Sequence, residues 1–435
     1  MIQNTRASRT ALAFLLTVTL APSVSAQFVT DGSIYSRFGI GELRQSATSQ
    51  AAAMGGGGTA FRGALYTNFA NPAAYGDLVL TSLAAGVNYQ TVSARDALDN
   101  HGRLSSGNLS FLQFSLPLKA QKLGIGATFA PYSVSRYRVR VSSAVQLPSD
   151  TTAYTIDYGG SGGLQQATFA VGYTINSHVS VGATGMGLFG AIEESQETNF
   201  ENASYTRSIL SSSTRLRGFS GSVGVLGSAK NLLRENDRLT VGMTYSFPVN
   251  LQADRVLTSG DPQERDTLNS AITGDLSIPS SLAIGLHYRA SSHVSVIADV
   301  LSQRWSGFSS TVTLPGYVPD AAGNNIRDRV RLSGGVEWLP AGNDALAGYA
   351  ARIAYRFGVF YDQSYISPSA SMAIDAIGAT GGLSLPTLVP GTRIDINLEV
   401  GQRGTTDNGL VKDRFFKIGL NVNVGERWFL KQRLG

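Results

Sequence analysis

The chain has 435 residues, including 49 glycines and no cysteine, and only 15% of its residues are charged against 43% that are apolar. This composition excludes a disordered chain, which needs many charges and few apolar residues. The lack of cysteine excludes disulfide scaffolds and thiolate metal sites. The formal net charge of +5 is too small to indicate nucleic-acid binding.

The N-terminus has the features of a secretory signal peptide. Arg6 and Arg9 precede an apolar stretch at 11–21, and Val24-Ser25-Ala26 fits a cleavage site. The apolar stretch is shorter than the roughly 20 residues that a membrane-spanning helix needs. We therefore expect residues 1–26 to be a signal peptide on an exported protein. A buried N-terminal helix is the alternative.

Residues 27–78 do not alternate between apolar and polar positions. The stretch Leu43–Met54 is rich in helix formers and predicts a helix that ends at Gly55–Gly58. No Gly-Lys-Ser/Thr follows the four glycines, so they do not form a phosphate loop, and they indicate a tight backbone in a confined space instead. A free tail would expose four aromatic residues, which favours a hatch that fills a lumen: Phe38, Phe61, Phe69 and Tyr75.

From residue 79 onwards the chain repeats a two-residue period, which is typical of strands. In 282–288, for example, Leu282, Ile284 and Leu286 share one face, and Ala283, Gly285 and His287 the other. About 14 such segments begin near residues 79, 107, 123, 165, 178, 205, 237, 272, 293, 329, 348, 370, 391 and 411. Aromatic residues near segment ends, Trp305 and Trp338 among them, fit interfacial girdles.

The connections between these segments alternate in length. Short ones lie at 119–122, 176–178, 290–293 and 387–390, and longer polar ones near 93–106, 140–164, 197–204, 257–271 and 312–328. Short turns on one side and long loops on the other are typical of outer-membrane barrels, and a soluble sandwich is not expected to sort its loops in this way. The sequence therefore predicts an all-β fold, a transmembrane antiparallel β-barrel of about 14 strands over residues 79–435, with an N-terminal hatch at 27–78.

A family resemblance adds to this prediction. The runs Ala53–Ala60 and Asn68–Ala73 resemble the N-terminal hatch of the FadL/TodX outer-membrane transporters, and the opening Ile34–Gly39 is similar to the branch from the Bacteroidetes. Two further sets resemble later strand pairs of the family: Ile278–Gly285 with Asp299 and Trp305, and then Arg331, Gly334, Glu337, Arg352, Gly358 and Tyr361. The resemblance implies a 14-stranded barrel, plugged by its hatch, that takes up hydrophobic compounds such as long-chain fatty acids.

The C-terminus departs from that family. Its terminal strand ordinarily ends in an aromatic residue, whereas this chain ends Trp428-Phe429-Leu430 and then continues to Gly435. The pattern Lys417-x-Gly419-x-x-Val422-x-Val424 matches the form that barrel-insertion machinery reads in last strands, so we expect that machinery to be a partner during assembly.

The candidate site residues lie in the hatch. We expect the hatch aromatics and Leu65 to line a substrate pocket, and Arg37 or Arg62 to hold a carboxylate by charge-assisted hydrogen bonds. In the alternative, both arginines pair with acidic residues inside the lumen. Asn71-Pro72 predicts a turn between hatch and first strand. The full set is Arg37, Phe38, Phe61, Arg62, Leu65, Phe69, Asn71 and Pro72.

Pro131 falls inside the predicted third strand. Proline cannot donate a hydrogen bond to the strand ladder, and the resemblance implies a side opening at a kinked third strand. We therefore expect a lateral exit into the membrane at Pro131, with a position at the barrel rim as the alternative. An intact hydrogen-bond ladder through 129–133 would contradict the exit.

These observations predict passive uptake of a hydrophobic compound across the bacterial outer membrane. The four histidines lie in unrelated segments, and no nucleophile elbow or phosphate loop is present, so we expect no enzyme, cofactor or metal site. The expected partners are membrane lipids and a hydrophobic small molecule, with no nucleic acid, and the protein is expected to be a monomer.

A FadL-fold scaffold or shuttle protein of a secretion system is the alternative function. The lumen distinguishes the two. A transporter should have a continuous apolar pocket beside the hatch, whereas a scaffold can have a filled lumen and an extended, rigid outer loop.

Overall fold

The computed structural model describes residues 32–45, 47–63, 68–146, 151–202, 204–261, 263–268, 271–317, 326–367, 373–389 and 391–428. The predicted signal peptide, residues 1–26, and the candidate Leu65 lie outside these residues. No helix in the described ranges is long and apolar enough to cross a bilayer.

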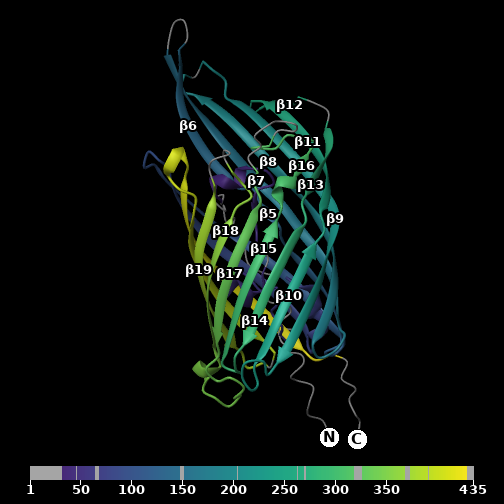
Figure 1. The fold of residues 1–435 in the computed structure, drawn as a ribbon. Helices are drawn as coiled ribbons and strands as arrows, with labels where there is room; N and C mark the ends of the chain where they lie inside the picture. The colour runs from purple at the N-terminus through teal and green to yellow at the C-terminus, as the bar shows by residue number, and fades with distance from the viewer. Residues whose placement is uncertain are drawn as a thin grey trace, which may run out of the picture.

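A closed antiparallel barrel of 14 strands forms the wall, as the sequence predicted (Figure 1). β21 pairs back onto β2, from Thr81↔Glu426 to Arg95↔Lys412, and this pairing closes the ring. In order around the ring the strands are β2 (Thr81–Arg95), β3 (His101–Lys119), β4 (Leu123–Pro131), β7 (Thr151–Thr174), β8 (Val179–Phe200), β9 (Ser208–Lys230), β10 (Arg238–Ser246), β14 (Ser281–Arg289), β15 (Val294–Gln303), β17 (Arg329–Trp338), β18 (Ala354–Gln363), β19 (Asp375–Pro386), β20 (Arg393–Arg403) and β21 (Lys412–Glu426).

The two-residue period places apolar side chains outside and polar ones inside. In β21, Phe416, Ile418 and Leu420 are exposed on the outer face, whereas Asn421 and Asn423 are buried on the inner face. An exposed band of this kind is stable where lipid covers it. The same alternation therefore explains both the strands and the outer surface.

Several strands continue past the ring as hairpins. β6 (Tyr137–Gln146) pairs with the first half of β7, from Tyr137↔Gly160 to Gln146↔Thr151, and rises above the rest of the barrel in Figure 1. On the neighbouring wall, four further strands extend the barrel: β11 (Val249–Gly260), β12 (Arg265–Thr267), β13 (Ile272–Ile278) and β16 (Ser309–Ser310).

The prediction of long loops was therefore wrong for 140–164, and for most of 93–106, because these residues are largely in strands. Where water meets both faces of a hairpin, its strands need no alternation of apolar and polar residues, because backbone hydrogen bonds between the two strands hold them together. The short turns near 119–122, 176–178 and 290–293 are confirmed as tight connections.

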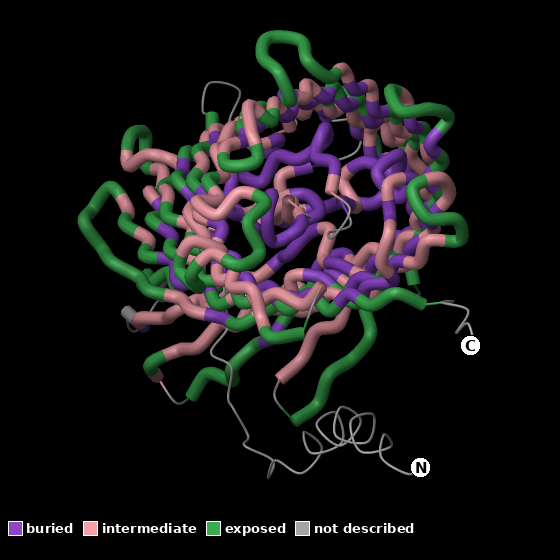
Figure 2. The backbone as a smooth tube through the Cα atoms, turned by 90° about the horizontal axis from the view of Figure 1, so that it is seen from below, coloured by how far each residue is buried: buried purple, intermediate pink, exposed green. Residues whose placement is uncertain are grey.

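The described residues between 32 and 78, here called the plug segment, lie inside the barrel. Viewed along the barrel, buried backbone crosses the interior of the ring (Figure 2). The segment contains four short elements: η2 (Ile34–Arg37), β1 (Glu42–Leu43), α2 (Ser49–Ala53) and η3 (Pro72–Asp77).

The predicted helix over Leu43–Met54 was too long, since α2 covers only Ser49–Ala53. Thr48 is the N-cap of α2, and its hydroxyl accepts a hydrogen bond from the backbone N–H of Ala51. Of the residues before Thr48, Glu42 and Leu43 (β1) instead pair with β5 (Ser133–Val134) in a two-stranded sheet separate from the barrel.

Aromatic residues divide between the core and the outer surface. Trp338 is half exposed and lies 5.5 Å from Tyr355, as expected of a girdle. Trp305, predicted for the same role, is fully buried and stacks on Tyr365 at 4.0 Å. Trp305 thus belongs to the apolar core near the outer end of the plug segment.

Candidate functional site

The four-glycine run is fastened to the barrel wall by hydrogen bonds. Gly55 donates its N–H to Thr380 Oγ1 (2.8 Å), and its carbonyl accepts from Arg331 Nη2 (2.9 Å). The Asp299 carboxylate accepts from the N–H groups of Gly58 (3.0 Å) and Thr59 (2.7 Å). Gly55 has a φ of +85°, a conformation that favours glycine.

Two wall glycines make room for this run. Gly335 and Gly358 are register partners on β17 and β18. A Cβ on Gly335 would lie 2.5 Å from the Cβ of Met54, and one on Gly358 would overlap the backbone of Met54 and Gly55. The plug segment and the wall therefore meet backbone to backbone, as the interpretation of a tight backbone in a confined space requires.

Asn71-Pro72 makes the turn expected of it and also binds the wall at β9. The Asn71 amide donates to the carbonyls of Thr59 (2.9 Å) and Val225 (3.1 Å), and its oxygen accepts from the N–H of Ala73 (3.0 Å). Pro72 begins η3. This asparagine therefore positions the plug segment rather than presenting a group to a ligand.

The two candidate arginines lie in different environments. Arg62 Nε donates to Asp77 Oδ2 (2.5 Å), and its other nitrogens reach Ser228 (2.7 Å) and Ser180 (3.0 Å). Arg62 therefore pairs with an acidic residue of the protein, which was the alternative to its binding the carboxylate of a ligand. The Arg37 guanidinium lies 5.3 Å from the centre of the Tyr158 ring.

The candidate aromatic residues are not gathered in one pocket. Phe61 is buried and stacks on His287 at 4.9 Å, and Phe38 packs against the core that contains Trp305. Of the four hatch aromatics, Phe69 and Tyr75 line one of the principal cavities, a space of about 200 Å³ that they share with Tyr132. The structure therefore distributes the predicted residues over several places.

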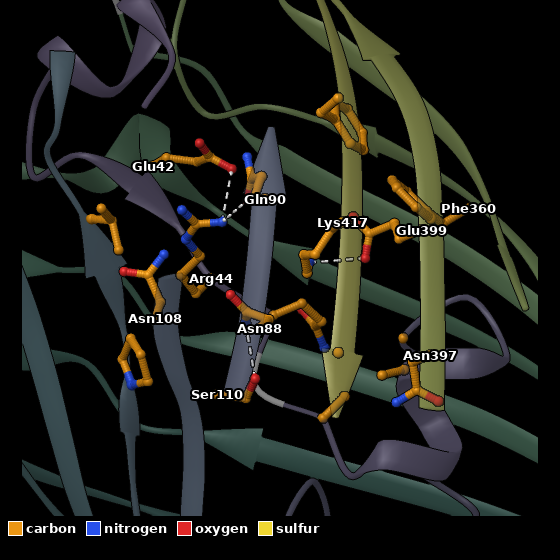
Figure 3. A pocket seen from close by; sticks show the side chains of 18 of the residues that line it. Glu42, Arg44, Asn88, Gln90, Asn108, Ser110, Phe360, Asn397, Glu399 and Lys417 are labelled. Carbon is orange, nitrogen blue, oxygen red and sulfur yellow. Dashed lines mark hydrogen bonds and ion pairs between the residues drawn. The ribbon is translucent and has the colours of Figure 1, made fainter. Parts of the chain in front are cut away.

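A second cavity, of about 160 Å³, lies between the plug segment and the wall strands β2, β20 and β21 (Figure 3). We call it the β20–β21 cavity. Charged side chains line it: Glu42, Arg44, Arg331, Asp362, Glu399, Arg403 and Lys417. So do carboxamides and phenyl rings: Gln45, Asn88, Gln90, Asn108, Asn397 and Asn421, with Phe111, Phe360 and Phe415.

The charges of this cavity are paired. Arg403 donates to Glu42 (2.7 Å), Lys417 to Glu399 (2.9 Å) and Arg331 to Asp362 (2.8 Å). The Arg44 guanidinium donates to Gln90 Oε1 (3.0 Å). The lining therefore combines paired charges with apolar side chains such as Leu109, Val134 and Leu398, in contrast to the continuous apolar pocket expected of a hydrophobic-compound transporter.

Sequence reasoning missed this cavity. Its residues come from positions between 42 and 421, and no short motif joins them. One signal was present in the sequence: the inward positions of the last two strands carry Asn397, Glu399, Lys417 and Asn421 rather than small residues.

Glu42 gives a pH dependence that can be tested. Burial acts to raise its pKa, but the nearby Arg403 guanidinium outweighs burial and holds the pKa at about 2, below its usual 4.5. Because the pKa is lowered in the folded state, Glu42 stabilises the fold above about pH 4.5, and this contribution is lost as the pH falls towards 2. Thermal unfolding at pH 7 and pH 3 should show a smaller acid-induced loss of stability in Glu42→Gln than in wild type. Glu264→Gln, at an exposed hairpin, should behave like wild type; an equal acid response in Glu42→Gln would contradict the assignment.

The wall is interrupted beside β4. Pairing between β3 and β4 stops at Leu112↔Phe129, although β4 stays paired with β7 as far as Pro131↔Gln165. The chain then turns inward as β5 and pairs with β1 of the plug segment. Residues 101–111 of β3 pair with β2, and no strand pairing joins them to β5 or β6 in the described chain.

Pro131 lies at this gap, which we call the β3–β4 gap. Near Pro131, β4 therefore keeps its backbone pairing with β7, whereas its pairing with β3 has ended at Phe129. Ser110, Phe111 and Pro131 also line the β20–β21 cavity, so the cavity extends from the plug segment to the gap.

Comparison with known proteins agrees with this architecture. Three solved structures with the same fold are the monoaromatic hydrocarbon channel CymD (16% identity, TM-score 0.54), a FadL homologue of Pseudomonas aeruginosa (13%, 0.58) and the toluene transporter TodX of P. putida (16%, 0.55). The matches cover 88–89% of this chain and 98–100% of those chains. The molecule thus has the fold of the FadL-type barrels.

The family follows from the sequence. The model of the BamG family matches residues 1–435, and the chain belongs to that family. No curated protein matches the chain. Within the described residues, no group of three or more His, Asp or Glu side chains is arranged to hold a metal ion.

Proposed function

We propose that this chain is an outer-membrane scaffold that takes part in the assembly of other outer-membrane proteins. The observation that carries the proposal is the charged β20–β21 cavity, which occupies the place where a conduit for apolar compounds needs an apolar surface. An alkyl chain there would strip water from paired charges and amides without replacing their hydrogen bonds, which is unfavourable.

Two further observations support a scaffold. The family name, BamG, refers to barrel assembly. The β6–β7 hairpin extends beyond the rim as a continuous ladder and is braced by a bidentate pair between Arg140 and Asp157 (2.6 and 2.8 Å). A hairpin that extends beyond the rim is the kind of surface that a scaffold offers to a partner.

Isolation of the complete, tagged protein from its own outer membrane in mild detergent tests the proposal. We expect other outer-membrane proteins to co-purify in stoichiometric amounts. Replacing residues 141–156 by Asn-Gly, between the register partners Arg140 and Asp157, should release partners held by the hairpin and leave the barrel folded. The matched control replaces residues 94–102 by Asn-Gly, between the register partners Ser93 and Arg103. A barrel that purifies alone in every case contradicts the scaffold.

Uptake of hydrophobic compounds such as long-chain fatty acids is the second candidate, and the β3–β4 gap favours it. In this role Pro131 would mark the exit, residues 27–78 would act as a hatch, and Phe69 would contact the substrate. Lipid extraction of the same preparation separates the two functions. A co-purifying fatty acid that is lost on substitution of Phe69, with no protein partner, would support uptake.

A further inference from the structure

The outer face of the barrel over β21 and β2 carries an apolar band with a charged edge. On β21 the outward side chains within 416–424 are 39–48% exposed: Phe416, Ile418, Leu420, Val422 and Val424. A strand crosses the hydrocarbon core of a bilayer in about 9–11 residues, so this run has the length of a complete crossing. The next outward residue towards the outer rim is Arg414, which is exposed. Arg414 therefore lies at the level of the lipid headgroups.

Arg103 of β3 lies in the same row as Arg414. Ser93 of β2 is the register partner of Arg414 on one side and of Arg103 on the other. All three residues are exposed, whereas Asp413, the neighbour of Arg414 in the chain, is buried on the inner face. Register partners hold their Cβ atoms about 5 Å apart, so the Cβ atoms of the two arginines are about 10 Å apart. Both long side chains can therefore reach one group placed over the serine between them.

The two guanidinium groups have no acidic partner in the described part of the chain. Neither Arg103 nor Arg414 forms an ion pair or a hydrogen bond there, although the outward Arg95, one row nearer the rim, is paired with Asp99 (2.5 Å). This face of the barrel therefore presents two positive charges that no described carboxylate balances.

Another face of the wall has arginines beyond its apolar residues, but it also supplies their partners. Arg215 and Arg217 lie on β9 on the rim side of Phe219, which is 87% exposed. Arg217 Nε donates to Gln252 Oε1 (3.1 Å), and Arg215 is the register partner of Asp254 on β11. Unbalanced positive charge is therefore not a general feature of the rim.

The chemistry of the face fits a phosphate group with hydrocarbon attached. Each guanidinium offers a planar fork of donors that matches phosphate oxygens. Below the arginine row, Tyr89 (49% exposed) and Val87 (53% exposed) of β2 offer an apolar surface in the band. A molecule with phosphate at one end and hydrocarbon chains at the other matches both parts, whereas a free anion matches only the first.

The face also borders the β3–β4 gap. Arg103 lies in the stretch 101–111 of β3, which pairs with β2, and the pairing of β3 with β4 begins only at Leu112. A lipid held at Arg103 would therefore lie along the open side of the wall.

We propose that Arg103 and Arg414 bind the phosphate headgroup of an outer-leaflet lipid, whose chains lie on Tyr89 and Val87 beside the β3–β4 gap. The site goes beyond the scaffold function. It is equally compatible with uptake, because both functions place the apolar band in a bilayer.

Native mass spectrometry of the intact barrel tests this site. The protein is purified in octyl tetraoxyethylene, and dilauroyl phosphatidic acid, dilauroyl phosphatidylcholine or inorganic phosphate is then added. The two lipids have the same chains, but the choline cation neutralises the phosphate of the second. We expect one phosphatidic acid to be retained per barrel in preference to phosphatidylcholine. Arg103→Gln and Arg414→Gln should each weaken its binding about fivefold, the equivalent of about 1 kcal/mol per basic residue near a membrane surface.

Two further variants separate charge from structure. Arg217→Gln removes an outward arginine that has a partner within the protein, so it is the matched control and should bind like wild type. The double variant Arg103→Lys with Arg414→Lys keeps both charges and should bind more phosphatidic acid than the double glutamine variant. Heat-modifiable migration on gels verifies that each barrel is closed.

Four results would each overturn the proposal. These are phosphatidic acid retained no better than phosphatidylcholine, a double glutamine variant that binds like wild type, equal losses in the lysine and glutamine double variants, and inorganic phosphate retained as strongly as phosphatidic acid. The last result would indicate a site for a free anion rather than for a lipid.

Discussion

Gly358→Ala is expected to displace the plug segment and to lower the free energy of unfolding by about 3 kcal/mol, the upper end for an overpacked core. The added methyl group would overlap the backbone nitrogen of Gly55 and the carbonyl carbon of Met54. Neither atom can rotate away, because Arg331 and Thr380 hold this turn by hydrogen bonds. Thermal unfolding in detergent measures the loss, and protease digestion measures the release of the plug segment.

Gly334→Ala is the matched control. It lies one residue from Gly335, the register partner of Gly358, and a Cβ there would have its nearest neighbour, the carbonyl of Ile297, 3.6 Å away. This variant should unfold like wild type. If Gly358→Ala were as stable and as protease-resistant as Gly334→Ala, the contact between the plug segment and the wall would be wrong.

Arg356→Met is expected to cost about 3–5 kcal/mol, since removing one partner of a buried ion pair leaves an unpaired charge. Arg356 is 1% exposed and donates to Glu337 Oε2 (2.7 Å) and Asp395 Oδ1 (3.5 Å). Asp395 has no exposed surface and accepts a hydrogen bond from Ser49 of α2 (2.5 Å). The substitution therefore weakens the attachment of α2 as well as the wall, and thermal unfolding again measures the change.

A double variant separates charge from packing. Asp395→Asn in the Arg356→Met background removes the unpaired charge and should recover part of the lost stability. Arg138→Met, on the exposed part of β6, should change little. Absence of any recovery in the double variant would point to lost packing around Arg356 as the cause.

The barrel could be predicted from the sequence because its period is local. The alternation in 416–424 shows which face of the strand meets lipid, and no knowledge of the neighbouring strands is needed. The short turns are local signals too, and they mark where one strand ends and the next begins. The outer hairpins could not be predicted in this way. Water meets both faces of the strands that contain Arg140 and Asp157, so these strands show no apolar period.

The interior was harder to predict, since it depends on contacts between distant residues. The four glycines correctly indicated a confined backbone, but nothing local to Arg62 reveals that Asp77 and Ser228 lie beside it. The same holds for Glu42, whose partner Arg403 follows 361 residues later. The charged cavity exists only when the ring has brought such positions together.

The attachment of the plug segment has a consequence for how the molecule comes apart. Its hydrogen bonds reach β15 through Asp299, β19 through Thr380, β20 through Asp395 and β9 through the carbonyl of Val225. Each of these contacts is kept only while the barrel is closed, because its partner lies on a different wall strand. We therefore expect the barrel wall and the plug segment to unfold together in one cooperative transition, with no separate unfolding of the plug segment.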